Sequence, residues 1–428
     1  MKIAIEGGTP VRSQPLPLEY PGVHYMDEEE VEAAVRVLRS RSLFRYYGPE
    51  PQNETGLFEE EFARFLDVRY ALAVSSGTGA LHTALAALGV GPGQEVIVPA
   101  YLWVSIVGAV VSRGAIPVLA DIDDTFCLDP ADVERRITPR TVGIVLAHMS
   151  GAPGDAPALA ALARKHGLFL VEDCAQCAGG ALGGRKVGTF GDIGVFSFQL
   201  NKNMTCGEGG CVVTDDAGLY RRAVACHDVG YARDVNGRLI LNPPDLSLWG
   251  MGYRMDELRA AVLRVQLRKL PRIVCAMRRS KYRIRRELER LPGVIPRRVL
   301  DPPGDTGCFL IVSFAGAEEA REVNAALRAE GIVTSPGGIS NILMTNWGLH
   351  LYSNNASLVD LASTDGRGFP WTLADNSGST LRYAKGTCPV ADSLFERSIL
   401  LAIPSCLTAA DEDDIVSAFQ KVVPAGVR

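Results

Sequence analysis

The chain has 428 residues, 47% of them hydrophobic and 22% charged, and its formal net charge at pH 7 is −5. This composition is typical of a soluble globular protein and excludes a disordered chain, and the negative charge gives no electrostatic basis for binding nucleic acid. No apolar run is long enough to span a bilayer, and the N-terminus lacks the apolar segment of a signal peptide. Because the ten cysteines form no small-domain disulfide framework, the sequence predicts a cytoplasmic protein with reduced thiols.

A chain of this length exceeds one ordinary hydrophobic core, so we expect a large domain and a smaller one. We assign residues 1–54 to an N-terminal arm and helix, residues 55–255 to the large domain, and residues 256–428 to the small domain. In the arm, Asp27 and Glu30 form a capping-box pattern at the start of a helix. A second helix is expected over residues 55–66, and the apolar stripe of the first consists of Val31, Ala34, Val35 and Leu38.

From Tyr70 onward, apolar β-runs alternate with helical patterns. Helices are expected over residues 80–88, 104–112 and 156–165, the last closed by Gly167. The expected strands cover residues 70–75, 95–99, 116–120, 141–147, 168–172, 193–198 and 211–214. This alternation predicts a mainly parallel sheet covered by helices on both faces, with ligands beyond the carboxyl ends of the strands.

The pattern changes after Asp216. A helix to about Cys226 precedes a polar loop over residues 228–245, and Asp256 then caps a long helix. The basic segment 278–290 is interpreted as the solvated face of a helix. A strand at 308–314 and a helix at 317–330 indicate a small α+β domain, in which the polar run 353–379 is an expected loop or insertion.

Two motifs at strand ends could bind a planar, phosphorylated ligand. Residues 75–79, Ser-Ser-Gly-Thr-Gly, precede a helix, and the free N–H groups of a helix N-terminus suit a phosphate, although such residues also cap helices for stability alone. Trp103 follows another strand and could cover a planar ligand, although an aromatic residue there is more often part of a core.

Two further motifs carry ionisable groups. Glu172 and Asp173 end an apolar strand, where carboxylates are costly to bury, so they indicate either a site or a structural ion pair. Lys202 lies in a glycine-containing loop between two β-runs, as either a positioned amine or a solvated side chain. The pair Cys174 and Cys177 is interpreted as buried small side chains, with metal or redox use as the second alternative.

Four strand-end motifs that converge would suit one ligand: a planar, phosphorylated ring that condenses with an amine. Pyridoxal phosphate (PLP) meets these requirements, with an aspartate on the pyridine nitrogen and a lysine on the aldehyde. Among the six histidines, only His148 is expected near such a site, and the remainder are expected to be structural or exposed: His24, His82, His166, His227 and His350.

The sequence resembles the DegT/DnrJ/EryC1/StrS family of sugar aminotransferases. The resemblance rests on the motifs SSGTGALHTAL, VPAYLWVS, VEDCAQCAGG, GDIGVFSFQLNKNMTCGEGGCVVTDD and GYRMDELRAA. It implies the fold of aspartate aminotransferase, fold type I of the PLP-dependent transferases, and a homodimer whose active site lies at the subunit interface. No metal site is expected.

The resemblance also implies a role for each matching residue. Lys202 matches the lysine that forms the Schiff base and shuttles a proton, and Asp173 matches the partner of the pyridine nitrogen. Gln176 matches the neighbour of the ring hydroxyl, and Trp103 matches the aromatic residue stacked on the ring. The phosphate cradle is matched by Gly77, Thr78, Gly79 and Ser197.

One position departs from the family pattern. Where the family has G-x-N-Y-R-M, this chain has Gly250-Met-Gly252-Tyr-Arg-Met, so the asparagine that reaches the other subunit's phosphate is absent. Gly79 also stands where alanine is common, which is a smaller change.

The expected activity is transfer of an amino group from glutamine or glutamate to a keto-cyclitol or keto-sugar, in amino-sugar or aminocyclitol antibiotic biosynthesis. The N-terminal Gly7-Gly-Thr-Pro-Val-Arg12 favours the cyclitol branch. Two alternatives remain: a PLP-dependent dehydratase, epimerase or oxidase acting on a sugar, and a non-catalytic regulator that only binds PLP.

Overall fold

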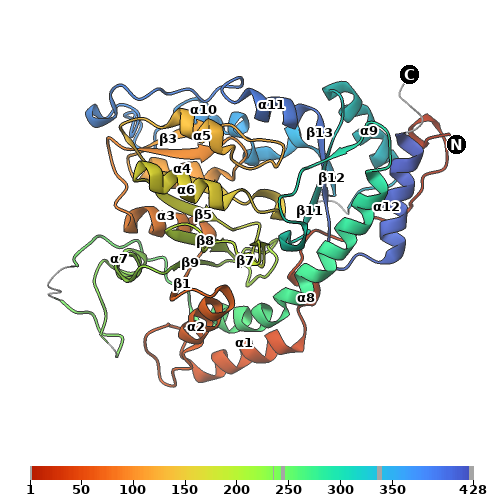
Figure 1. Ribbon diagram of the computed structural model, residues 1–428. Coiled ribbons are helices and arrows are strands. Elements are labelled where there is room, and N and C mark those ends of the chain that lie inside the picture. Colours follow the sequence, from red (N-terminus) through yellow and green to blue (C-terminus); the bar gives the residue numbers. More distant parts are fainter. Residues whose placement is uncertain (1, 235, 242–245, 335–339, 424–428) are drawn as a thin grey trace.

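The computed structural model describes residues 2–234, 236–241, 246–334 and 340–423 (Figure 1). A seven-stranded sheet forms the core of its large domain. The strands follow the order β1 (Tyr70–Val74), β9 (Gly210–Thr214), β8 (Ile193–Ser197), β5 (Phe169–Asp173), β4 (Thr141–Ala147), β2 (Glu95–Pro99) and β3 (Ile116–Ala120).

Most neighbours in this sheet are parallel, which confirms the predicted architecture. β2 pairs in parallel with β3 and β4, and β5 pairs in parallel with β4 and β8. Only β9 runs against its neighbours β1 and β8. The parallel register sets Asp173 beside Ala147 of β4 and Val195 of β8, so three carboxyl ends meet at one edge.

Both faces of the sheet are covered because alternate residues of each strand point to opposite sides. In β4, Ile144 and Leu146 belong to the core cluster that includes α6 (Ala156–His166). Val145 and Ala147 belong to the cluster that includes α3 (Gly77–Ala87), α4 (Val104–Ser112) and α7 (Ala217–His227). Another helix, α5 (Pro130–Arg136), lies between β3 and β4 along the chain.

Three helices form a support beside the sheet: α1 (Glu28–Ser40), α2 (Glu54–Leu66) and α8 (Glu257–Leu288). α8 packs against α1 and α2 at one end and against α12 (Ala409–Val422) at the other, so it runs along both domains (Figure 1). It continues through Pro271 into the basic segment. Because neighbouring Leu270 and Ile273 are fully buried, packing stabilises the helix despite the lost N–H group.

The capping box of α1 is confirmed, but its predicted apolar stripe is not the buried face. Val31 and Leu38 are each 52% exposed, whereas Ala33 and Val37 are buried. The side of α1 that meets α8 includes the polar Glu30, which binds the side chains of Gln266 and Lys269. A hydrophobicity pattern cannot identify a face that is held in part by buried polar contacts.

The smaller domain contains a four-stranded sheet in the order β10 (Ile295–Pro296), β11 (Phe309–Ser313), β13 (Ser398–Ala402) and β12 (Asn341–Leu343). Its described pairs are antiparallel. Helices α9 (Ala317–Ala329), α11 (Pro389–Glu396) and α12 complete it. The other short elements are β6 (Ala181–Leu182), β7 (Arg185–Lys186), α10 (Ala356–Val359), η1 (Ala4–Glu6), η2 (Val23–Tyr25), η3 (Met149–Gly151), η4 (Pro302–Gly304), η5 (Met344–Asn346), η6 (Gly348–His350), η7 (Tyr352–Asn354) and η8 (Ala374–Asn376).

The predicted polar insertion at residues 353–379 consists mainly of turns and short helices, and it packs against the edge of the large sheet. Asn376 donates to the carbonyl of Gly114 and accepts from the N–H of Gly93. Just beyond, the hydroxyl of Tyr383 donates to the carbonyl of Pro117 in β3. The segment therefore covers an edge strand that would otherwise expose unpaired backbone groups.

Among the described residues, no helix is both long enough and apolar enough to cross a membrane.

Candidate active site

A cradle for an anion lies where α3 begins beside the end of β8. Ser76 caps the helix, and its Oγ accepts the N–H of Gly79 at 2.9 Å. α3 starts at Gly77, three residues before the predicted start, so the N–H groups of Gly77 and Thr78 belong to its unpaired first turn. The hydroxyls of Thr78 and Ser105 are 2.8 Å apart. Sequence reasoning missed Ser105.

The cradle requires glycine at position 77. A Cβ on Gly77 would lie 2.6 Å from the Cβ of Ser197, so a side chain there would displace β8 from the helix N-terminus. Gly79 stands behind the cradle, where a Cβ would lie 3.3 Å from Tyr253. Small residues, two hydroxyls and free N–H groups fit the phosphate of PLP.

The two carboxylates at the end of β5 serve different purposes. Glu172 is fully buried and accepts N–H groups from Gly188, Phe190 and Gly191. Its Oε2 also lies 3.0 Å from Nε2 of His148. Glu172 therefore organises the structure, in agreement with the structural alternative for this residue.

Asp173 faces the cavity instead. Its Oδ1 accepts the N–H of Ala175 at 2.9 Å. Burial raises the pKa of Asp173, and this effect is opposed by the Ala175 N–H and by the positive charge of Lys202. A buried carboxylate that faces a cavity fits a cationic ring nitrogen, because such a partner would offset the cost of its burial.

His148 lies beside Asp173, as expected. Its backbone N–H donates to the carbonyl of Asp173, and its Nδ1 accepts the N–H of Gly154. Nε2 therefore carries the hydrogen that is donated to Glu172. His148, Glu172 and Cys174 are close enough to bind a metal. The existing hydrogen bonds of His148 and Glu172 already explain the cluster. Cys174 and Cys177 are fully buried, which confirms their interpretation as small core side chains.

Lys202 lies in the loop that connects β8 to β9. The loop is tied down by a hydrogen bond from the N–H of Gly22 to the carbonyl of Lys202. Burial lowers the pKa of Lys202, and the negative charge of Asp173 opposes this shift. Its amine has no hydrogen-bond or ion-pair partner within the described parts of the chain. A lowered pKa increases the fraction of free amine, which is the nucleophilic form.

An aromatic wall faces Lys202 across the cavity. Trp103 is 43% exposed, and its ring centroid lies 4.7 Å from that of His350. His350 stacks on Trp347 with centroids 4.2 Å apart, and its Nε2 lies 3.2 Å from Nε2 of Gln176. The expectation that His350 would be structural or exposed was therefore wrong, because a turn of the small domain brings it into the site.

Two adjoining cavities, of about 350 and 400 Å³, contain these groups. Both are lined by Trp103, Gln176, Asn201, Lys202 and His350. Seven of the eight predicted site residues line the first cavity, namely Gly77, Thr78, Trp103, Asp173, Gln176, Ser197 and Lys202. Gly79 lies behind it, and Gly252 does not line either one.

A larger cavity lies elsewhere. Its volume is about 970 Å³, and it is bounded by β3, α5 and the segment over residues 359–387. Four arginines and Lys385 line it, but none of the predicted site residues does. Volume alone therefore does not identify the site, whereas the chemistry of the lining groups does.

Comparisons with known proteins agree with this geometry. The model of the DegT/DnrJ/EryC1/StrS aminotransferase family matches residues 24–339. A relative from Streptomyces kanamyceticus, L-glutamine:2-deoxy-scyllo-inosose aminotransferase, is 40% identical over 99% of this chain and 97% of its own length.

Solved structures show the same fold. The structure of 3-amino-5-hydroxybenzoic acid synthase has a TM-score of 0.77 and 28% identity, covering 95% of this chain and 99% of that one. DesI, determined in the presence of its TDP-sugar product, has a TM-score of 0.76 and 29% identity, covering 99% of this chain and 97% of that one.

Proposed function

Because the chain belongs to the DegT/DnrJ/EryC1/StrS aminotransferase family, we propose that it moves the amino group of glutamine to a keto-cyclitol, using PLP bound beside Lys202. It is an aminotransferase by family. The observation that carries the cofactor proposal is the buried amine of Lys202, which shares one cavity with the Asp173 carboxylate and the anion cradle.

Each residue of the site would have its own role. Gly77, Thr78 and Ser197 would hold the phosphate, Trp103 would cover the ring, and Asp173 would bind its nitrogen. Lys202 would bond the aldehyde carbon and then move a proton once substrate has displaced it. When bound, the cofactor supplies an electron sink for the carbon that loses or gains the amine.

The cavity lining supports an uncharged ring as acceptor. Lys202 is the only lysine or arginine among the described residues that line the two cavities. Asn201, Asn346 and the rings of Trp347 and His350 are neutral groups that suit a polyhydroxylated ring. A nucleotide-linked sugar would bring a diphosphate, which cations usually bind. The S. kanamyceticus relative, named for a cyclitol substrate, favours the same choice.

We further propose a cytoplasmic homodimer with the active site at its interface. The described parts of the segment between α7 and α8, residues 228–234, 236–241 and 246–256, include a loop that projects from the body of the subunit (Figure 1). They carry Trp249, which is 96% exposed, and Leu241, which is 74% exposed. Apolar side chains so fully exposed on one projecting segment suit burial against a second copy.

The acceptor proposal is tested by supplying PLP, glutamine and either 2-deoxy-scyllo-inosose or a nucleotide-linked keto-sugar, and measuring the amine that forms. We expect turnover with the cyclitol and formation of one 2-oxo acid per amine. Turnover with the nucleotide-linked sugar alone would refute the acceptor class. A dehydratase, epimerase or oxidase would act on its sugar without consuming glutamine.

A further inference from the structure

The side-chain amide of Gln176 is held from two sides. Its Oε1 accepts the backbone N–H of Ser150 at 2.8 Å, and its Nε2 lies 3.2 Å from Nε2 of His350. Because a backbone N–H can only donate, Oε1 must face Ser150. The NH₂ group of Gln176 therefore faces His350 and the cavity, and its orientation follows from the hydrogen bonds alone.

His350 is fixed in one tautomer. Its Nδ1 lies 2.9 Å from the carbonyl of Trp347, and a carbonyl only accepts, so Nδ1 carries the hydrogen. Burial lowers the pKa of His350 to about 4, so the ring is neutral near pH 7 and Nε2 keeps its lone pair. Nε2 therefore accepts one hydrogen from Gln176, whose second amide hydrogen has no partner within the described chain.

Ser150 adopts a conformation that non-glycine residues rarely take. It is fully buried in the left-handed region, with φ 55° and ψ 33°. Its Oγ lies 2.7 Å from the hydroxyl of Tyr101. This backbone conformation sets the direction of the N–H that binds Gln176, and unfavourable conformations of this kind persist where the surroundings hold them.

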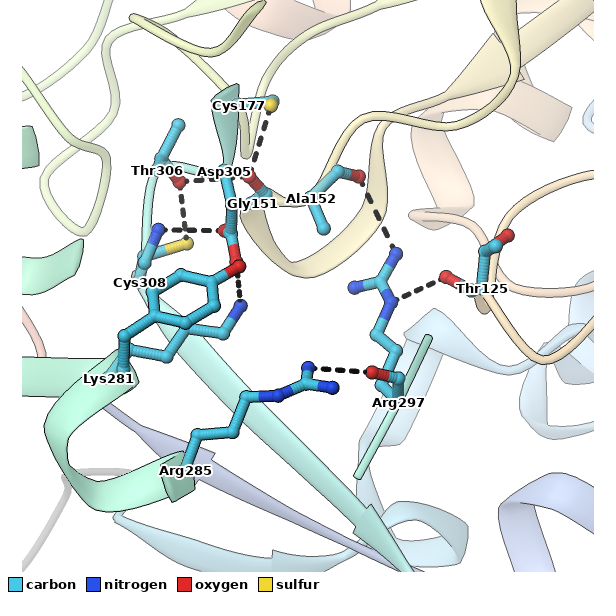
Figure 2. A network of polar contacts seen from close by, with 12 residues as sticks. Thr125, Gly151, Ala152, Cys177, Lys281, Arg285, Arg297, Asp305, Thr306 and Cys308 are labelled. Atoms are coloured by element: carbon cyan, nitrogen blue, oxygen red, sulfur yellow. Dashed lines mark hydrogen bonds and ion pairs between the residues drawn. The ribbon is translucent and has the colours of Figure 1, made fainter. Parts of the chain in front are cut away.

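The surroundings of Ser150 include residues from both domains. The carbonyl of the next residue, Gly151, accepts three hydrogen bonds: from the N–H and the hydroxyl of Thr306 and from the thiol of Cys177 (Figure 2). A Cβ on Gly151 would lie 2.4 Å from both Thr306 Oγ1 and Cys308 Sγ, so the packing leaves no room for one.

Asp305, the residue before Thr306, connects this part of the chain to α8. Asp305 is fully buried and forms an ion pair with Lys281, which is drawn with it in Figure 2. It also accepts the hydroxyl of Tyr282 at 3.0 Å and the N–H of Gly307 at 2.9 Å. A continuous series of contacts thus leads from α8 to the amide of Gln176.

We propose that Ser150 and His350 are positioning residues, which hold the Gln176 amide so that its free N–H points at the bound ligand. This inference rests on the proposed function for the identity of that ligand: the free N–H would meet the ring oxygen of PLP. Neither residue needs to touch the reacting atoms.

A double-mutant cycle tests the proposal. His350→Phe keeps a ring against Trp347 but removes the acceptor, and Gln176→Ala removes the amide. Each protein is freed of cofactor and titrated with PLP, and the pH midpoint of the visible absorbance band of the loaded protein is then measured. We expect each single variant to bind PLP roughly fivefold more weakly, the change for one neutral hydrogen bond, and to move the midpoint in the same direction. The double variant should match Gln176→Ala alone.

Two results separate this proposal from alternatives. His350→Gln places an amide oxygen near the position of Nε2, so it should restore most of the PLP affinity that His350→Phe loses. Equal effects of His350→Phe with and without Gln176 would overturn the proposal, because His350 would then act independently of the amide.

The same four proteins are also melted without cofactor, so the test does not depend on the proposed function. We expect the double variant to lose less in melting temperature than the two single variants together. If the wild-type protein binds no PLP, the proposed function fails, and this coupling alone decides the positioning role. Additive melting shifts would then overturn it.

Discussion

Replacing Lys281 by methionine removes one partner of the buried ion pair that joins α8 to Asp305, the residue before Thr306. The side chains of Lys281 and Asp305 are 2% and 0% exposed. Burial lowers the pKa of Lys281, and the negative charge of Asp305 opposes that shift. The attraction between the two charges therefore offsets the cost of removing Lys281 from water. Removing the lysine leaves a buried carboxylate whose remaining donors, among the residues that the structure describes, are the Tyr282 hydroxyl and the Gly307 N–H.

The expected loss follows from the burial of the pair. Breaking a buried pair by removing one partner costs about 3–5 kcal/mol. For 428 residues, the entropy of unfolding is about 0.9 kcal/mol/K, so the melting temperature should fall by about 3–6 °C. Melting followed by circular dichroism measures this shift.

Lys385→Met is the matched control. Lys385 pairs with Glu396, but the two side chains are 64% and 42% exposed, and such a pair contributes less than about 1 kcal/mol. The control should therefore shift the melting temperature by about 1 °C or less. Equal shifts for the two variants would refute the reasoning. The double variant Lys281→Met with Asp305→Leu should be more stable than Lys281→Met alone, because no uncompensated charge remains.

Three further predictions concern single residues. Ser150→Ala removes the hydroxyl that pairs with the buried Tyr101 hydroxyl, so the free energy of unfolding in urea should fall by about 1–3 kcal/mol. Ser150→Gly should be about 1 kcal/mol more stable than Ser150→Ala, because glycine accepts φ 55° without strain. The reverse order of stability would contradict the strain argument. Burial lowers the pKa of His227 to about 3 and that of His350 to about 4. Below about pH 6.5 the unfolded chain therefore binds more protons than the folded chain. The stability present above that pH should fall by up to about 1.4 kcal/mol per pH unit for His227 as the pH decreases toward 4. A urea midpoint that stays constant between pH 7 and pH 5, or a drop unchanged by His227→Asn, would argue against this. Gly252→Asn should be tolerated within about 1 kcal/mol, because asparagine accepts φ 71° and a Cβ there meets nothing within 4 Å. PLP titration should show tighter binding if the asparagine reaches the partner's phosphate, and a loss in melting temperature well above about 1 °C would contradict the open geometry.

The sheet was predictable because buried parallel strands are short apolar runs bounded by turn residues. Every strand of the large sheet begins and ends within one residue of its predicted bounds. The start of α3 was placed too late because Gly77 and Gly79 indicate a turn by composition, although Ser76 caps a helix there. Helix was predicted over both parts of α8, but not its continuity through Pro271; proline normally ends a helix, and only tertiary packing overrides that preference.

Residues that act through long-range contacts left weaker signals. Lys202 and Asp173 lie at strand ends, where position and chemistry together indicate a site. His350 lies in none of the elements predicted for the small domain, and the structure brings it beside Gln176, which is 174 residues away along the chain. Its spacing from Trp347 was the one available local signal, since residues three apart in a helical turn share a face. The left-handed backbone of Ser150 has no sequence signal at all.

In the proposed reaction, PLP bound beside the buried amine of Lys202 takes the amino group of glutamine. The most direct test adds glutamine to the PLP-loaded protein without any acceptor and measures the absorbance spectrum together with the 2-oxo acid released. We expect loss of the visible cofactor band and about one 2-oxo acid per bound PLP, because each cofactor can accept one amine. We expect neither change in Lys202→Ala and both changes in Lys385→Ala. An unchanged spectrum in the loaded wild-type protein, or equal release by Lys202→Ala, would contradict it.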